Sequence, residues 1–289
     1  MALRWGQRTH VMGVINLTPD SFSDGGRFHR PEQALAQCHR LVAQGVEILD
    51  LGAQSTRPGA EDVGAEQELA RLLPALAAIR AAIDSGALRC SPRAADQPGR
   101  APLISVDTFR SAVARAALEA GADWINDVSG ARFDPLILPL VAEAGCPYVL
   151  MHSRGDSRSM DRLTDYGPAG VVQAVRTELL AASERALAAG LSRDQLIWDP
   201  GLGFAKTTEQ NLELLRGLPA LRAEGIPLLV GPSRKRFIGA VLDEPRPKAR
   251  LWGTAAVVAQ CVSAGVDVVR VHDGGAIVQV ARMADALWR

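Results

Sequence analysis

Polar residues with chemically useful side chains stand at the ends of eight apolar runs in this chain. These residues are Asn16, Asp50, Asp107, Asn126, Asp127, His152, Asp199, Ser233, Arg270, His272 and Asp273. Their carboxylate, amide, imidazole and guanidinium groups donate and accept hydrogen bonds and carry charge of either sign. Eight such run ends, spread over the whole chain, predict one composite site to which distant segments contribute.

One group of these residues has the chemistry of an anion site. Asn16, Arg57, Arg270 and His272 belong to the first, second and eighth runs or to the segments that follow them. Arg270 and His272 are two residues apart, so their side chains point to the same side of a strand. Guanidinium groups, an imidazole and an amide together bind phosphate oxygens well. The sequence therefore predicts a phosphate clamp.

A second group suits a flat heterocycle. Asp107, Asn126, Asp199 and Lys235 follow the third, fourth, sixth and seventh runs. Together they offer donors and acceptors to a ring that has several N–H and C=O edges, and an ionised aspartate can also stabilise a developing cation. Other aspartates at the run ends are expected to cap loop N–H groups.

The elements between the runs must bring these ends together. Amphipathic, alanine-rich stretches that favour helix separate the runs, whose nearly continuous apolar character is typical of parallel strands covered on both faces. Eight strand–helix repeats predict an α/β fold, a (β/α)8 TIM barrel, in which residues 1–289 form a single domain and the site lies at the carboxyl ends of the strands. The expected strands are 10–16, 46–52, 103–107, 123–128, 147–151, 195–199, 227–231 and 267–272.

Three connecting segments differ from the others. Residues 85–100 have the composition of a flexible loop and join the second helix to the third strand, so we interpret them as a surface insertion on the rim opposite the site. Residues 18–26 and 53–59 follow the first two strands and are rich in turn formers and hydroxyl groups. We expect these two loops to close over a substrate.

The composition argues against several classes of function. The chain has 32 basic and 32 acidic residues, and its formal net charge of +0 provides no global field for nucleic acid or an acidic membrane. The 4 cysteines are far apart without a C-x-x-C motif, which fits a reducing compartment without disulfides or zinc. The motifs of ATP-binding loops, serine hydrolases and zinc proteases are missing. We expect a cytoplasmic protein that acts on small molecules, with no nucleic-acid or membrane partner.

The ordered motifs of the chain resemble those of dihydropteroate synthases. The matching segments are 11–26, 50–59, 105–108, 125–130, 151–152, 199–206, 231–239 and 270–273. The resemblance extends from about residue 10 to the carboxyl terminus and omits only the 85–100 insertion. It implies an enzyme that joins 4-aminobenzoate to (7,8-dihydropterin-6-yl)methyl diphosphate, releasing diphosphate and forming 7,8-dihydropteroate for folate synthesis.

The resemblance also implies roles for individual residues. The pterin would be held by Asp107, Asn126, Met151, Asp199 and Lys235. The diphosphate would be held by Asn16, Thr56, Arg57, Arg270 and His272, with Mg2+ near Asn16. The aminobenzoate site would be formed by Phe22, Pro58, Phe204, Ser233 and Arg234. Catalysis would rest on Asp107, Asp199, Lys235 and Arg270, and the protein would form a homodimer, as the family usually does.

Two alternative functions remain open. Methyltetrahydrofolate corrinoid methyltransferases share the heterocycle-binding residues, but they need neither the phosphate clamp nor the Ser233-Arg-Lys235 segment that this chain carries. A non-catalytic paralogue would keep the pterin pocket and act as a binding or regulatory protein. Its only support is Gln54, because the family usually carries Gly-Glu where this chain has Ala53-Gln54. Leu202 replaces a common phenylalanine, which is a conservative apolar change.

Overall fold

Strands and helices alternate along the whole chain. The computed structural model describes residues 3, 5–18, 31–55, 62–90 and 99–289. Its strands are β1 (His10–Asn16), β2 (Ile48–Gly52), β3 (Leu103–Asp107), β4 (Trp124–Asp127), β5 (Tyr148–Met151), β6 (Leu196–Asp199), β7 (Leu229–Val230) and β8 (Val268–Val271). All eight predicted strands are therefore present, within two residues of their expected ends.

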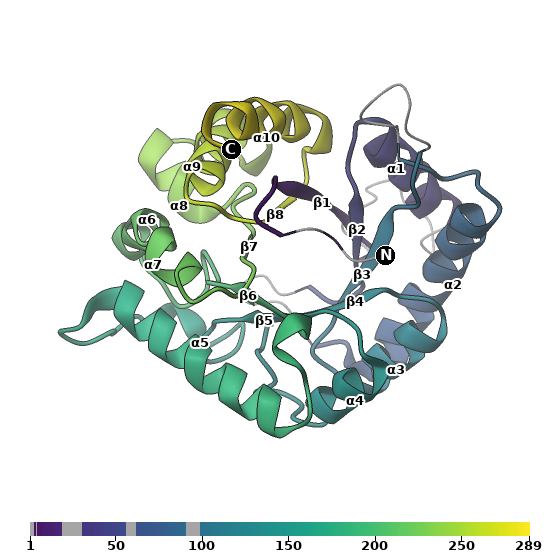
Figure 1. Cartoon of the computed structure of the whole chain (residues 1–289), viewed down its shortest axis with the longest axis horizontal. Coiled ribbons are helices and arrows are strands. Elements are labelled where there is room, and N and C mark those ends of the chain that lie inside the picture. The colour runs from purple at the N-terminus through teal and green to yellow at the C-terminus, as the bar shows by residue number, and fades with distance from the viewer. Residues whose placement is uncertain (1–2, 4, 19–30, 56–61, 91–98) are drawn as a thin grey trace.

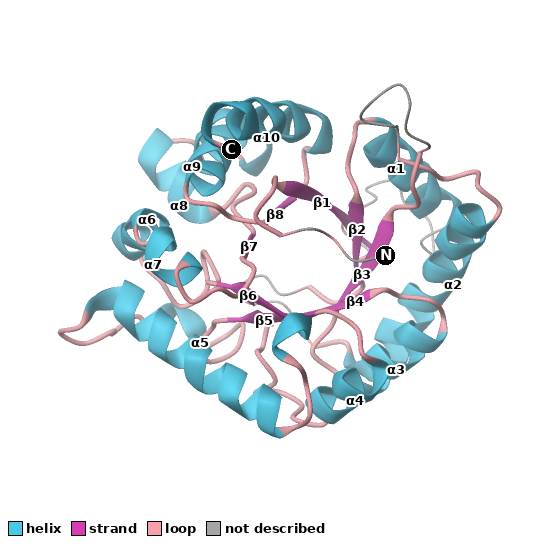
Figure 2. Ribbon diagram, in the orientation of Figure 1, coloured by secondary structure: helices cyan, strands magenta, loops and turns pink. Residues whose placement is uncertain are grey.

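Helices follow the strands and surround them (Figures 1 and 2). They are α1 (Pro31–Ala43), α2 (Gly64–Asp84), α3 (Ser111–Glu119), α4 (Ile137–Ala144), α5 (Gly170–Ala188), α6 (Thr208–Arg216), α7 (Leu218–Arg222), α8 (Arg236–Leu242), α9 (Leu251–Ser263) and α10 (Gly274–Trp288). Short 3-10 helices occupy η2 (Met160–Arg162), η3 (Arg193–Gln195) and η4 (Pro247–Arg250). Among the described helices, none is long and apolar enough to cross a membrane.

The strands form a parallel barrel. Their order in the sheet is β6-β5-β4-β3-β2-β1-β8-β7. A parallel bridge between Trp198 and Leu228 joins β6 and β7, the first and last strands in this order. The backbone N–H of Trp198 donates to the Pro227 carbonyl at 2.8 Å. Just before β7, the Leu228 N–H donates to the Asp267 side-chain carboxylate at 3.0 Å, and the backbone ladder with β8 starts only at Leu229. The prediction of a (β/α)8 barrel is confirmed.

The inward-facing positions of the strands explain where the site lies. A buried cluster fills the end of the barrel near the amino ends of the strands and consists of Met12, Ile48, Trp124, Val149, Ile197, Leu229 and Val268. Side chains alternate across a strand, so the next inward residue is two positions later. That step leads from Ile48 to Asp50, from Ile197 to Asp199 and from Val268 to Arg270. The same register therefore places apolar residues at one end and polar residues at the other.

Outward-facing residues pack against the helices. The main core lies between the barrel and its helical ring and includes Ile15, Leu49 and Val106. Trp198 belongs to it, and its indole N–H donates to the Ser183 hydroxyl on α5 at 2.8 Å. This bond ties α5 to the strand that carries Asp199.

A carboxylate closes the opposite end of the barrel. Glu47, just before β2, binds the Arg8 guanidinium at 2.7 and 2.8 Å and lies 2.9 Å from Nδ1 of His10, and it also pairs with Arg100. The Cys90 N–H donates to the Arg100 carbonyl at 2.8 Å. The two described ends of the 85–100 segment therefore meet beside Glu47, away from the carboxyl ends of the strands. Residues 91–98 of the proposed insertion lie outside the described residues.

Candidate active site

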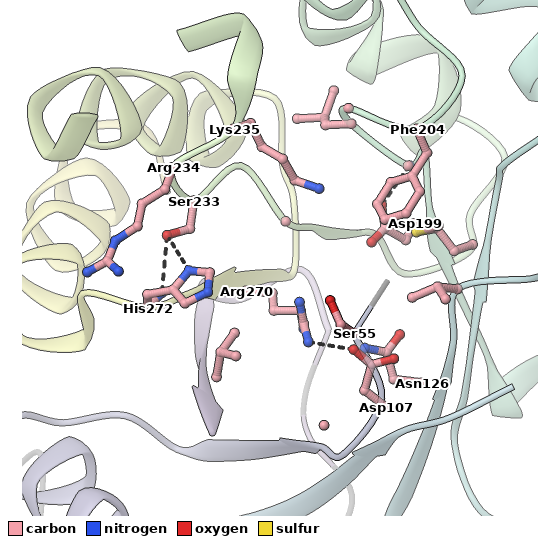
Figure 3. A pocket seen from close by; sticks show the side chains of 18 of the residues that line it. Ser55, Asp107, Asn126, Asp199, Phe204, Ser233, Arg234, Lys235, Arg270 and His272 are labelled. Atoms are coloured by element: carbon pink, nitrogen blue, oxygen red, sulfur yellow. Dashed lines mark hydrogen bonds and ion pairs between the residues drawn. The ribbon is translucent and has the colours of Figure 1, made fainter. Parts of the chain in front are cut away.

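A cavity of about 590 Å³ opens at the carboxyl ends of the strands (Figure 3). All eight strands, or the loops that directly follow them, contribute charged, polar or sulfur-bearing side chains to its lining: Asn16, Gln54, Ser55, Asp107, Asn126, Met151, Asp199, Ser233, Lys235, Arg270 and His272. These are run-end residues or close neighbours that the sequence singles out. The fold thus brings the two predicted halves into one pocket.

Arg270 joins the strands on two sides of this pocket. Its Nε donates to the Asp50 carboxylate at 2.6 Å, and its Nη2 donates to the Asp107 carboxylate at 2.7 Å. Burial raises the pKa of Asp107 to about 7, although the Arg270 guanidinium opposes this shift. Burial alone would lower the pKa of Arg270, but the two carboxylates outweigh it and raise that pKa. The guanidinium is therefore a fixed positive charge between two buried acids.

Asp50 has no predicted ligand role, yet it organises the pocket floor. It is fully buried, and it also accepts hydrogen bonds from the Ser105 hydroxyl at 2.6 Å and from the Asn126 amide at 3.4 Å. Asp50 thereby fixes both the arginine and the amide that line the cavity. Its place two residues after buried Ile48 is a sequence signal for an inward carboxylate, but its partners come from three other strands.

Asp199 and Lys235 face each other across the heterocycle half. The Asp199 carboxylate accepts from the Gly201 N–H at 2.7 Å, and burial raises its pKa. Burial lowers the pKa of Lys235 to about 8, with the Asp199 charge opposing the shift. The Lys235 ammonium also lies 4.4 Å from the centre of the Phe204 ring, a cation–π contact. These groups can bind a ring through donors and acceptors of both kinds.

The anion half is described only in part. Asn16 lies at the end of β1 and lines the pocket, and Nδ1 of His272 lies 3.0 Å from the Ser233 hydroxyl. Thr56 and Arg57 lie outside the described residues. The contact between His272 and Ser233 brings together residues that the resemblance assigned to different substrates.

The aminobenzoate residues are likewise divided. Phe204, Ser233 and Arg234 line the cavity, whereas Phe22 and Pro58 lie outside the described residues. Arg234 has a left-handed backbone with φ 60°, and its Nε donates to the Asp273 carboxylate at 2.9 Å. Its guanidinium thus points toward α10 and away from Lys235 (Figure 3). The Arg234 backbone therefore shapes the cavity wall, whereas its positive charge is directed to Asp273 and not into the cavity.

Arg250 supports this wall and was not anticipated from the sequence. Its guanidinium donates to the carbonyls of Arg234 at 3.0 Å, Glu244 at 2.9 Å and Pro245 at 2.6 Å. A Cβ on Gly239 would lie 2.5 Å from its Nε, so this glycine is needed for the close approach. Gly239 belongs to the 231–239 motif, and a glycine at this position is the sequence feature that indicates a closely packed neighbour.

Gln54, the main departure from the family pattern, has a definite local function. Its Nε2 donates to the Ser55 carbonyl at 3.0 Å, and its Oε1 accepts from the Val63 N–H at 3.1 Å. The amide thereby joins the two described ends of the β2–α2 connection. A carboxylate at this position could accept from Val63 but could not donate to Ser55.

Comparison with known proteins agrees with this geometry. The family model described as "Pterin binding enzyme" matches residues 12–272. The dihydropteroate synthase of Synechocystis sp. is 48% identical over 285 residues, which cover 99% of this chain and 92% of that protein. The folic acid synthesis protein fol1 of Pneumocystis carinii is 40% identical over 97% of this chain, but the chain spans only 36% of its length. The structure of Xanthomonas albilineans dihydropteroate synthase with 4-aminobenzoic acid is 38% identical, with a TM-score of 0.85 and coverage of 98% of this chain and 94% of that one.

The barrel and the mixed pocket define a pterin-binding enzyme of the (β/α)8 class. Within that class, the chain belongs to the dihydropteroate synthase family of folate synthesis.

Proposed function

We propose that this chain joins 4-aminobenzoate to (7,8-dihydropterin-6-yl)methyl diphosphate to form 7,8-dihydropteroate and diphosphate. The observation that carries the proposal is one cavity that combines a heterocycle half, with Asp107, Asn126, Asp199 and Lys235, and an anion half at β1 and β8. Xanthomonas albilineans dihydropteroate synthase has been solved with 4-aminobenzoic acid and with 7,8-dihydropteroate, which supports the same reaction here.

The pterin is assigned to the deepest groups of the cavity. Asp107, Asn126 and Asp199 are almost fully buried, and Met151 contributes an apolar surface. An ionised Asp199 accepts ring N–H groups, and Lys235 donates to ring acceptors. When the pterin methylene becomes positively charged, the carboxylates of Asp199 and Asp107 stabilise it.

The diphosphate is assigned to Asn16, Arg270 and His272, together with Thr56 and Arg57. A guanidinium carries five N–H donors, and the bonds to Asp50 and Asp107 use those of Nε and Nη2. We assign the Nη1 side of Arg270 to the leaving group. Arg270 then couples the two halves, because the same cation orders the acids around the pterin and faces the departing anion.

The donors around the anion half fit a bound Mg2+. No cluster of three or more histidine, cysteine or acidic residues that could hold a metal is found in the part of the chain that the structure describes. Mg2+ prefers oxygen ligands and is commonly held by few protein groups together with substrate phosphates. The Asn16 amide oxygen would supply one protein ligand, and the diphosphate and water would supply the others. Bound there, the ion would offset charge on the leaving diphosphate.

The bond changes follow from this arrangement. The C–O bond to the diphosphate breaks first, and its electron pair leaves with the diphosphate oxygen. The neutral amine of 4-aminobenzoate then attacks the cationic methylene, forms the C–N bond and releases a proton to solvent. Phe204 and Ser233 border the amine's approach, with Phe22, Pro58 and Arg234 assigned to the same site. No protein nucleophile is required.

The direct test is to measure diphosphate release from the dihydropterin substrate with Mg2+, with and without 4-aminobenzoate. We expect release that depends on 4-aminobenzoate, with dihydropteroate as the product. Pterin binding without product would overturn the proposal and favour the non-catalytic paralogue. A cobalamin-dependent methyl transfer would favour the methyltransferase alternative.

We also propose that the enzyme is a cytoplasmic homodimer. Large apolar side chains are exposed on α8, α9 and α10, namely Val241, Leu242, Trp252, Met283, Leu287 and Trp288. A second copy of the chain would cover this α8–α10 apolar surface. All four cysteines are buried thiols that form no disulfide, which supports a reducing compartment. Cell fractionation with an antibody to the chain tests the location, and an exported pool would contradict it.

A further inference from the structure

The loop between β6 and α6, residues 200–207, forms a wall of the pocket through Gly201, Leu202, Gly203 and Phe204. The loop is tightly curled, because Gly201, Gly203 and Ala205 all have left-handed backbones, with φ of 69°, 77° and 50°. Such curling turns backbone carbonyls toward a common centre, and buried carbonyls need donors. The group at that centre therefore decides whether the loop keeps its shape.

The ammonium of Lys206 occupies this centre. Its Nζ donates to the carbonyls of Gly201 and Phe204, both at 3.0 Å, and lies 3.0 Å from Nδ1 of His152. Lys206 is only 8% exposed and is not among the residues that line the cavity. An ammonium has three N–H donors and no acceptor, so these three contacts use its whole capacity.

The neighbours of Lys206 have the protonation states that this arrangement needs. Nδ1 of His152 can accept only if the ring is neutral, and burial lowers the pKa of His152 to about 4. Its Nε2–H then donates to the Glu178 carboxylate on α5 at 3.0 Å. Arg154 binds the same carboxylate through Nε at 3.3 Å. Every donor in this series therefore faces an acceptor: Lys206 donates to His152, and His152 and Arg154 both donate to Glu178.

We infer that Lys206 is a positioning residue, whose ammonium group holds the β6–α6 loop in the shape that sets Asp199 and Phe204 around the substrates. Two contacts transmit its effect. The Gly201 N–H binds the Asp199 carboxylate at 2.7 Å, and the Phe204 ring lies 4.4 Å from the Lys235 ammonium. This inference rests on the proposed function, because it names a residue that acts on the same substrates.

The charge of Lys206 is itself finely balanced. Burial lowers its pKa to about 7, and the nearby Asp199 carboxylate opposes that shift. Lys235, Glu178 and Arg154 are the other charged groups that act on it, and the Tyr166 hydroxyl donates to the Ala205 carbonyl at 3.0 Å on the same loop. A neutral amine would keep two donors for three acceptors, so the loop is held fully only by the protonated form.

A spectroscopic experiment tests the contacts without relying on turnover. The chain contains only three lysines, at positions 206, 235 and 248, so protein labelled with 15N and 13C on lysine gives few side-chain signals. The signal that disappears in Lys206→Met should have ammonium protons that exchange slowly with water at pH 6. It should also titrate near pH 7, because burial lowers the pKa of Lys206. Exchange as fast as that of Lys248 would overturn the proposal.

Kinetics test the consequence for the substrates. We expect Lys206→Met to lower kcat/KM for 4-aminobenzoate by about 10–100-fold, the range seen when a supporting contact is lost. The exposed Lys248→Met is the matched control and should match the wild type. Lys206→Arg should recover part of the loss, because a guanidinium can donate to the same carbonyls. An unchanged kcat/KM per folded molecule in Lys206→Met would show a merely structural role and refute the proposal.

The two proposals fail in different ways. If the wild-type chain forms no dihydropteroate, the proposed function fails, whereas slow ammonium exchange would still establish the Lys206 contacts. If the wild type is active but Lys206→Met is equally active, only the positioning role fails. Should Lys206→Met not fold, the partial recovery in Lys206→Arg and the wild-type exchange rates decide the matter.

Discussion

Burial and charge oppose each other at Asp199. The carboxylate is almost fully buried, which raises its pKa, yet the proposed reaction needs it ionised. We expect Asp199→Asn to reduce kcat/KM by about 10²–10³-fold, the range for removing one group that stabilises transition-state charge. Steady-state assays of dihydropteroate formation measure this, with the exposed Asp194→Asn as control. Near-normal kinetics in the Asp199 variant would exclude the cation-stabilising role.

The same substitution should not destabilise the fold at neutral pH. A raised folded-state pKa means that the unfolded chain releases its proton first as pH rises. The free energy of unfolding therefore decreases as the pH rises from the unfolded-state pKa to the folded-state pKa of Asp199. Asparagine does not titrate and so avoids this loss, while its side-chain oxygen can still accept from the Gly201 N–H. We expect Asp199→Asn to be at least as stable as the wild type at pH 8, with the difference vanishing near pH 3. Urea unfolding at both pH values checks the sign.

Single residues were predictable where the strand register decides them. Asp107, Asn126, Asp199 and Arg270 follow apolar runs, and the barrel turns each of them inward. Their hydrogen-bond partners were not predictable, because a carboxylate at the end of an apolar run does not indicate which other strand supplies its partner. Asp50 is the clearest example, since its bonds to Ser105, Asn126 and Arg270 depend on four strands in register.

At the scale of elements, the Arg250 side chain links the β7–α8 connection to the segment that follows α8 through hydrogen bonds. Its guanidinium binds the carbonyls of Arg234, Glu244 and Pro245. We expect Arg250→Met to cost about 3 kcal/mol of unfolding free energy, because hydrogen bonds from a charged group to buried carbonyls are lost. It should also raise KM for 4-aminobenzoate, because Ser233 and Arg234 lose their support.

Arg246→Met is the matched control for this prediction. Arg246 is exposed and binds Glu244 through a surface ion pair at 2.8 Å. Such pairs contribute little, so we expect a change within about 0.5 kcal/mol and normal kinetics. Chemical unfolding and steady-state kinetics of both variants provide the comparison. Equal effects in the two variants would contradict this stabilising role of Arg250.

Elements were easier to predict than the loops between them. Continuous apolar runs and alanine-rich amphipathic stretches determine strands and helices locally. The β6–α6 loop depends instead on Lys206, Tyr166 and Asn211, which approach it from inside the loop, from the β5–α5 connection and from α6. No periodicity in the sequence records such contacts. The loops 18–26 and 53–59 that were expected to close over the substrate are only partly within the described residues, so their closure stays a prediction.

For the whole molecule, the Glu47 ion-pair network and the pocket lie at opposite ends of the barrel. Glu47 binds Arg8, His10 and Arg100 at the end away from the pocket. We expect Glu47→Gln to cost about 2–4 kcal/mol, because an amide faces these donors with one acceptor instead of two. kcat/KM should stay within about twofold, since the site lies at the other rim. Glu143→Gln, on an exposed helix position, should change neither quantity, and a large kinetic effect in Glu47→Gln would refute the separation.

The proposed dimer is a second property of the whole molecule. Trp252 on α9 is 79% exposed, and the next residue, Gly253, packs against exposed Leu242 of α8. We expect sedimentation velocity to show a dimer for the wild type and a monomer for the double variant Trp252→Glu, Leu242→Glu. The monomer should remain folded, because neither side chain belongs to the core. A monomeric wild type at micromolar concentration would contradict the proposal.

The hydrogen bond between Cys90 and Arg100 has a practical consequence for how this enzyme can be handled. The residues on either side of the 91–98 segment are already joined by this hydrogen bond, so doubling the length of the segment costs only about 0.6 kcal/mol in closure entropy. An affinity peptide or a tether inserted there would emerge from the rim opposite the pocket. Enzyme immobilised through it would present every active site outward, accessible to substrates in the surrounding solution.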